Sequence, residues 1–135
     1  MGRVGESNRL EDAYRFRTPP LRNVALTAPY GHNGAYPTLE AMVRHHLDAA
    51  AARAAWTPAQ ARLPEVPWLA AIDFVIRSDR AEIARQVAVL DITPVPMTDG
   101  DVADLVAFLN ALTGATADHR PLGRPATVPS GRPVD

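Results

Sequence analysis

Apolar residues recur at helical spacing just before the middle of the chain, after a threonine. They fall at i, i+3, i+4, i+7 and i+8, and they are Leu39, Met42, Val43, His46 and Leu47. This spacing puts the side chains on one face of a helix. Thr38 occupies the N-cap position, so we predict a helix from Leu39 to about Asp48. On this helix His46 points where the apolar residues point, and His45 points away.

A second amphipathic stretch lies nearer the C-terminus. Its apolar positions at helical spacing are Val102, Leu105, Val106, Leu109 and Leu112. Thr98 and Asp101 form a variant of the capping box, with Asp in place of the usual Glu. We expect the helix to run until Gly114, because glycine commonly ends a helix.

The segment between these two helices has a less regular pattern. Residues 57–63 are compatible with a short helix, and prolines break residues 64–69 into a loop. Residues 78–90 are predicted to form a helix capped by Ser78 or Asp79. Because no stretch shows a convincing strand pattern, the predicted fold class is all-α with long irregular loops.

The remaining segments divide the chain into three parts. Residues 1–15 are polar and are expected to be a flexible N-terminal segment. Residues 16–114 form the predicted folded part, in which residues 27–38 make a turn-rich loop containing two glycines and two prolines. Residues 115–135 are rich in Pro, Gly and Arg and have little to bury, so we predict a disordered tail.

Composition excludes several classes of function. The chain has 135 residues and a formal charge of -1, which suits one domain and gives no electrostatic case for a nucleic-acid partner. The absence of cysteine excludes disulfides, cysteine-ligated zinc, iron–sulfur clusters and thiol catalysis by these residues. We expect no signal peptide and no membrane span, because no apolar run is long enough. As written, the chain would stay in the cytoplasm.

Three of the four histidines, His32, His45 and His46, are the candidates for chemistry. A neutral imidazole on an apolar helix face is either a core histidine bonded to backbone or a metal ligand, and the first is commoner. A shared zinc site is disfavoured because adjacent helical residues diverge by roughly 100°. The sequence lacks the common zinc-protease, serine-hydrolase and nucleotide-binding motifs.

Longer strings of residues carry a family resemblance. The stretch FRTPPLRNVALTAPYGHNGAYPTLEAMVRHH and the later MTDGDVADLVAFLNALTG resemble part of the bacterial di-haem cytochrome c peroxidase and MauG-like family. They are similar to the C-terminal half of its C-terminal haem domain, over roughly residues 14 to 114. The resemblance implies a partial cytochrome c-like domain and a role in electron transfer.

The resemblance also implies site residues. His46 matches the distal axial ligand of the C-terminal haem, commonly Met in the peroxidases and Tyr in MauG-like members. His32 matches a histidine near the haem propionates, and Arg22 is the cation expected to pair with a propionate. These two side chains are predicted to converge on one concave surface. The family's calcium takes backbone carbonyls at the positions of Thr27 and Pro29.

The departure from the family concerns haem attachment. The family binds haem c through Cys-x-x-Cys-His, and this sequence has no such motif. We therefore expect this chain to be the C-terminal part of a longer periplasmic oxidoreductase that reduces hydrogen peroxide. Its partners would be the missing haem-attachment portion and a small electron donor, such as a cytochrome c or a cupredoxin. The alternative is a haem-free helical interaction module, or a truncated remnant without activity of its own.

Overall fold

The structure is a computed structural model that describes residues 2–62, 66–117 and 128–131. Its helices are α1 (Val4–Ser7), α2 (Leu39–Leu47), α3 (Ala49–Ala55), α4 (Arg80–Ala88) and α5 (Asp99–Ala111). Short 3-10 turns lie between them. The described residues contain no strand, only one isolated β-bridge between Tyr30 and Tyr36. The all-α prediction is confirmed.

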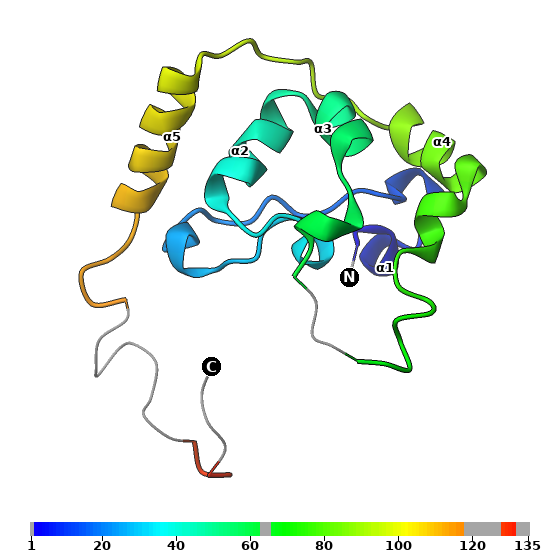
Figure 1. Cartoon of the computed structure of the whole chain (residues 1–135), viewed down its shortest axis with the longest axis horizontal. Helices are drawn as coiled ribbons and strands as arrows, with labels where there is room; N and C mark the ends of the chain where they lie inside the picture. Colours follow the sequence, from blue (N-terminus) through cyan, green and yellow to red (C-terminus); the bar gives the residue numbers. More distant parts are fainter. Residues whose placement is uncertain (1, 63–65, 118–127, 132–135) are drawn as a thin grey trace.

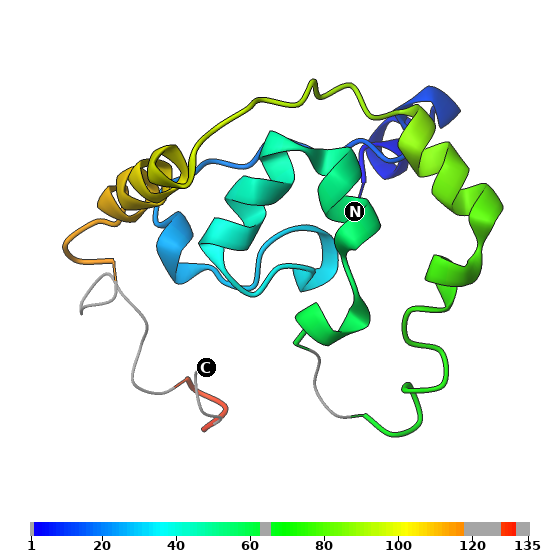
Figure 2. The same cartoon turned by 45° about the horizontal axis from the view of Figure 1, so that its top comes forward.

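Helices α2 and α3 lie at the centre of the molecule, with α5 on one side and α4 on the other (Figures 1 and 2). Helix α2 packs against both α3 and α5. The connection from α4 to α5 passes over the central helices, and its residues 89–98 are all exposed. The arrangement therefore leaves α5 attached mainly through α2 and the loop near residue 24.

Side chains cap the predicted helices as expected. The Thr38 hydroxyl accepts from the Ala41 amide at the start of α2, and the Asp79 carboxylate caps α4. Thr98 and Asp101 form the predicted capping box of α5. Helix α5 ends at Ala111, earlier than the predicted Gly114. The chain turns there because the Leu112 amide donates to the carbonyls of Leu109 and Asn110.

Helix α3 was not expected from the sequence. Its alanine-rich sequence gives no amphipathic pattern, yet alanine has the highest intrinsic helix propensity. Asp48 both terminates α2 and caps α3, accepting from the Ala51 amide at 2.8 Å. The short helix predicted within residues 57–63 is reduced to a single 3-10 turn, Pro58–Gln60.

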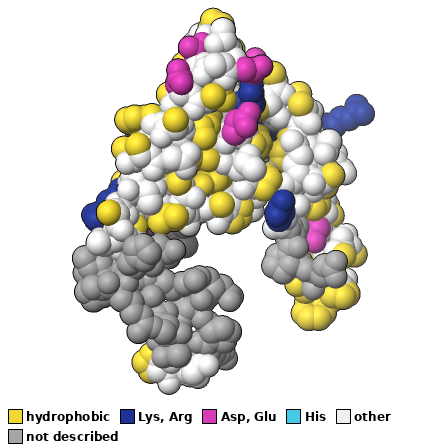
Figure 3. Space-filling model, turned by 60° about the vertical axis from the view of Figure 1, so that its left-hand side comes forward, with side chains coloured by type: hydrophobic (Ala, Val, Ile, Leu, Met, Phe, Trp, Pro, Cys, Tyr) yellow, Lys and Arg dark blue, Asp and Glu magenta, His cyan; other side chains and the backbone are white. Residues whose placement is uncertain are grey.

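The hydrophobic core is small. Tyr30, Tyr36 and Trp56 form its buried cluster, and Val102 of α5 is the most buried side chain, at 1 % exposure. Many large apolar side chains stay exposed, among them Phe16, Leu26 and Phe108, and Figure 3 shows apolar atoms spread over the visible face. The fold thus leaves much of its apolar surface uncovered.

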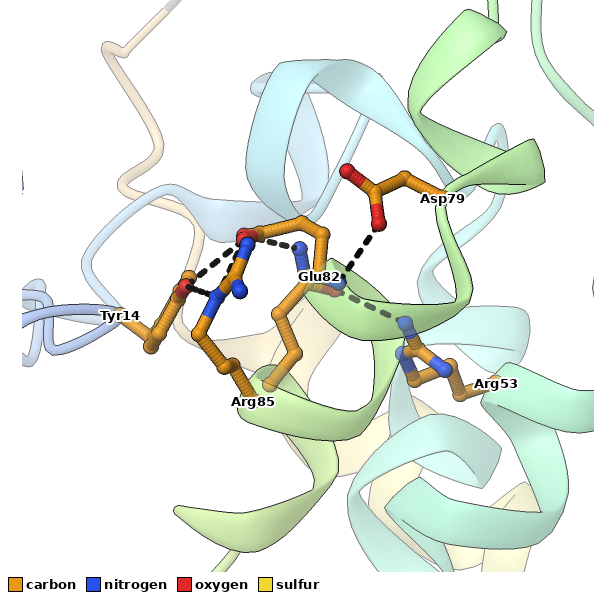
Figure 4. A network of polar contacts seen from close by, with 6 residues as sticks. Tyr14, Arg53, Asp79, Glu82 and Arg85 are labelled. Carbon is orange, nitrogen blue, oxygen red and sulfur yellow. Dashed lines mark hydrogen bonds and ion pairs between the residues drawn. The ribbon is translucent and has the colours of Figure 1, made fainter.

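The N-terminal segment is joined to the rest of the chain by polar contacts. The Tyr14 hydroxyl donates to Glu82 of α4 at 2.9 Å, and Arg85 donates to the same carboxylate (Figure 4). Arg85, with further help from neighbouring donors, lowers the pKa of Glu82. Within residues 1–15 the chain forms α1 and a 3-10 turn with a buried Asp12. Most of the predicted tail lies outside the described residues.

Over the part of the chain that the structure describes, no helix has the length and apolar character needed to cross a membrane.

Candidate functional site

The site begins with a tight loop before α2. Tyr30 and Tyr36 exchange two backbone hydrogen bonds, of 2.7 and 3.0 Å, and close residues 30–36 into a compact turn. Gly34 has a φ of +69°, and a Cβ there would lie 2.7 Å from Pro29. Only glycine fits this position without strain.

This loop contacts α2 through Tyr36. Its hydroxyl forms a 2.9 Å hydrogen bond with Nδ1 of His45, and the two ring centroids lie 5.0 Å apart. Burial raises the pKa of Tyr36. Burial, and to a smaller extent the neighbouring His46, lowers the pKa of His45. The prediction that His45 points away from the folded part is wrong, because the loop covers the side of α2 that carries it.

His46 is exposed, although its predicted face was expected to be buried. The loop covers α2 on the side of Met42 and His45. On another side, the Val95 amide bonds the Leu47 carbonyl and Asp99 pairs with Arg44. At about 100° per residue, His46 lies only ~40° from Met42 around the helix. It therefore shares an arc of the helix with Met42, which packs against the core cluster, yet it stays exposed near the C-terminal end of α2.

The ring of His46 has a defined hydrogen-bonding state. Its Nδ1 lies 3.0 Å from the Met42 carbonyl oxygen, one turn earlier in α2. A carbonyl can only accept, so Nδ1 carries the proton and donates it. In the neutral imidazole the lone pair then resides on Nε2, which is the nitrogen that a metal could bind. Metal-ligating histidines commonly donate their other ring N–H in this way.

The other predicted residues are not brought together by any recorded contact. The His32 ring packs against Phe16 at a centroid distance of 4.7 Å, and both His32 and Arg22 are exposed. Among the described residues, Arg22 and His32 share no hydrogen bond or ring contact. Their convergence on one concave surface stays a prediction.

Thr27 and Pro29 lie on an exposed part of the loop. Their two carbonyls would supply a minority of the six to eight oxygens that Ca²⁺ takes. Over the described residues, no group of three His, Asp or Glu side chains has the arrangement of a metal site. A calcium ion here would need most of its ligands from elsewhere, and the calcium site stays a prediction.

Two residues of the site region were not singled out from the sequence. Asn23, with a left-handed φ of 57°, bonds the segment that follows α5 through both its backbone and its side chain. Tyr36 anchors His45. Nothing in the sequence pattern indicates that the Tyr36 hydroxyl bonds His45. For Asn23, the residue type suggests a turn but not the long-range contact.

Comparison with known proteins gives two relatives. The chain is 33% identical over 102 residues to the methylamine utilization protein MauG of Paracoccus denitrificans, covering 73% of this chain and 23% of that protein. It is 48% identical over 44 residues to the cytochrome c peroxidase Ccp of Escherichia coli, covering 33% of this chain and 10% of that protein. No protein-family model matches, and no solved structure matches.

These similarities support a di-haem peroxidase-like family for the chain. The chain spans about a quarter of the first relative and a tenth of the second.

The residues present fit a haem in one respect and not in another. His46 offers an exposed imidazole whose Nδ1 is engaged by the Met42 carbonyl, which leaves Nε2 as the nitrogen that could take an axial position. The sequence contains no cysteine, so these residues cannot form the thioether bonds of haem c. An imidazole of this chain could thus ligate a haem, but none of its residues could form the thioether bonds.

Proposed function

We propose that the chain is the C-terminal part of a haem domain in a di-haem cytochrome c peroxidase-type oxidoreductase, and that His46 is an axial ligand of that haem. The observation that carries the proposal is the hydrogen bond from His46 Nδ1 to the Met42 carbonyl. This contact favours the neutral tautomer in which Nε2 is free to bind iron. The similarity to MauG and to a cytochrome c peroxidase supports the same type of chemistry.

In this proposal the haem supplies one-electron transfer, and the whole protein reduces hydrogen peroxide. The residues of this chain would bind the haem and orient its ligand. His46 would ligate through Nε2, with the Met42 carbonyl holding its ring through Nδ1. Arg22 would pair with a propionate, and His32 would lie near the haem. An imidazole in place of a thioether would give a lower potential.

The proposal also assigns partners and a compartment. The Cys-x-x-Cys-His segment would come from another portion of the parent protein, because these 135 residues contain no cysteine. Electrons would come from a small donor protein such as a cytochrome c or a cupredoxin, and the parent would be periplasmic. Calcium is proposed at the carbonyls of Thr27 and Pro29, with its remaining ligands from the parent.

A haem c peptide tests the axial ligand directly. Such a peptide carries haem on its own Cys-x-x-Cys-His segment and leaves one axial position open. Titrated into the 135-residue chain, it should change from a high-spin to a low-spin spectrum as His46 binds. His46→Ala should lose this change, and His32→Ala should keep it. A low-spin change that survives His46→Ala would refute the assignment.

A second candidate is a haem-free interaction module, and one observation favours it. Residues 66–76 expose several large apolar side chains, with Trp68 at 80 % exposure and Ile72 at 65 %. Exposed apolar clusters of this kind often mark protein-binding surfaces. The same titration separates the two candidates, because an interaction module would leave the haem c peptide high-spin at every chain concentration.

A further inference from the structure

The last turn of α2 is held at two points. The first is the 2.9 Å bond between Tyr36 and His45, and the second is the 2.8 Å bond from the Val95 amide to the Leu47 carbonyl. The carbonyls at a helix C-terminus lack partners within the helix, so the last turn frays unless tertiary contacts hold it. His46 lies between the two contacts.

Tyr36 is itself held by backbone and core contacts. Its backbone is paired with Tyr30 in the β-bridge, and its side chain is 8 % exposed within the core cluster. Gly31 and Gly34 close the loop that carries it, each with a positive φ. The Tyr36 hydroxyl is therefore a fixed point against which the adjacent helical turn is oriented.

We infer that Tyr36 is a positioning residue for the haem ligand: through its hydrogen bond to His45, it fixes the orientation in which His46 presents Nε2. This inference rests on the proposed function of His46. A ligand held in its binding orientation loses less conformational freedom when it binds. Loss of the Tyr36 hydroxyl should weaken haem binding without touching the ligand.

Tyr30 provides a matched control. It has the same exposure as Tyr36, 8 %, belongs to the same cluster and is its partner in the β-bridge. Its hydroxyl donates instead to the carbonyls of Val24 and Ala25, away from α2. Tyr30→Phe therefore removes an equivalent hydroxyl from the same loop but leaves the contact with His45 intact.

The test is titration of the 135-residue chain and its variants with the haem c peptide, following the low-spin spectrum. Loss of one net hydrogen bond corresponds to about fivefold weaker binding, so Tyr36→Phe should raise the Kd by that factor. The Kd of Tyr30→Phe should stay within about twofold of the Kd of the unsubstituted chain. Equal weakening by both variants would show that only loop stability matters, and would overturn the inference.

Variants of His45 give an independent route if Tyr36→Phe does not fold. Asn places a polar atom near the position of Nδ1, so His45→Asn should retain most of the affinity. His45→Leu should behave like Tyr36→Phe, at about fivefold weaker binding. If His45→Asn and His45→Leu bind equally, the positioning role is refuted. The His46→Ala variant tests the proposed function separately from the role of Tyr36. If the low-spin signal is lost in His46→Ala, the proposed function stands whatever the Tyr36 and His45 variants show. If the signal persists in His46→Ala, the proposed function is refuted.

Discussion

Asn23 and Gly114 are joined by a hydrogen bond across 91 positions of sequence. The Asn23 side-chain oxygen accepts from the Gly114 amide at 2.9 Å, and the Asn23 amide donates to the Leu112 carbonyl at 3.1 Å. Asn23 has a left-handed φ of 57°, a conformation that Asn tolerates better than most residues. This pair fastens the end of α5 to the loop that leads to the candidate site.

Removing the Asn23 side chain should therefore release the end of α5. Asn23→Ala loses the acceptor for Gly114 and also strains the left-handed backbone, so we expect a loss of about 1–3 kcal/mol in unfolding free energy. Asn23→Gly should recover the part due to strain. Urea unfolding measures the loss, and amide hydrogen exchange at Gly114 should accelerate in both variants.

Asn110 supplies the control for this prediction. Its side chain donates to the Val106 carbonyl within α5 at 2.8 Å, so it makes a local bond and no long-range one. Asn110→Ala should change stability by no more than about 0.5 kcal/mol. If Asn110→Ala costs as much as Asn23→Ala, then the long-range contact is not what secures the helix.

The two tryptophans should differ sharply in their contribution to stability. Trp56 is buried, its indole N–H donates to the Ala35 carbonyl at 2.8 Å, and the Arg77 guanidinium lies 4.8 Å from its ring centroid. Trp56→Phe should cost about 2 kcal/mol, from a lost hydrogen bond and a weakened cation–π contact. Trp68→Phe, at an 80 % exposed position, should change the unfolding free energy by no more than about 0.5 kcal/mol. Urea denaturation of both variants decides the point.

The α5 cap should make stability depend on pH in the acidic range. The side-chain and backbone hydrogen bonds of Thr98 lower the pKa of Asp101. A carboxyl group with a lowered folded-state pKa stabilises the fold above its unfolded pKa, and this contribution is lost as the pH falls through the folded value. The unsubstituted chain should therefore be more stable than Asp101→Asn at neutral pH, and this difference should vanish in acid.

Thr98 tests whether this effect belongs to the cap. Its hydroxyl and its amide both donate to the Asp101 carboxylate, and these bonds lower the pKa of Asp101. In a Thr98→Ala background the effect of Asp101→Asn on stability should therefore vary less with pH, as followed by parallel urea titrations. An unchanged pH dependence in that background would contradict the role of the cap.

The local chemistry of helix ends was readable in the sequence. Thr38, Asp79 and the pair Thr98–Asp101 all cap where predicted, because an N-cap depends on residues within one turn of each other. Helix α3 was missed because an alanine run has no apolar face to detect. The all-α class followed from the remaining periodicity.

The exposure of the two adjacent histidines was not readable in the same way. Helical phase correctly grouped His46 with Met42, but it does not reveal which part of an apolar arc the rest of the chain covers. That depends on the loop of residues 30–36, whose closure by Tyr30 and Tyr36 is a tertiary property. The loop covers His45 and leaves His46 exposed.

Met42 is a poor competitor of His46 for a haem iron. A Cβ built on Gly31 would lie 3.5 Å from the Met42 sulfur, which places that sulfur against the loop. Met42 is also one turn earlier in α2, about 6 Å along the helix axis at 1.5 Å per residue. Reaching the same iron would require the helix to move.

Met97 is the remaining competitor, because it is 43 % exposed and directly precedes the Thr98 cap of α5. We predict that His46 ligates and Met97 does not. In the proposed full-length di-haem protein, His46→Ala should convert one haem from a low-spin to a high-spin spectrum, since the imidazole ligand would be lost. Met97→Ala should leave both spectra unchanged. A high-spin signal produced by Met97→Ala alone would assign the ligand to the segment before α5 and would show that the exposed His46 is not the ligand.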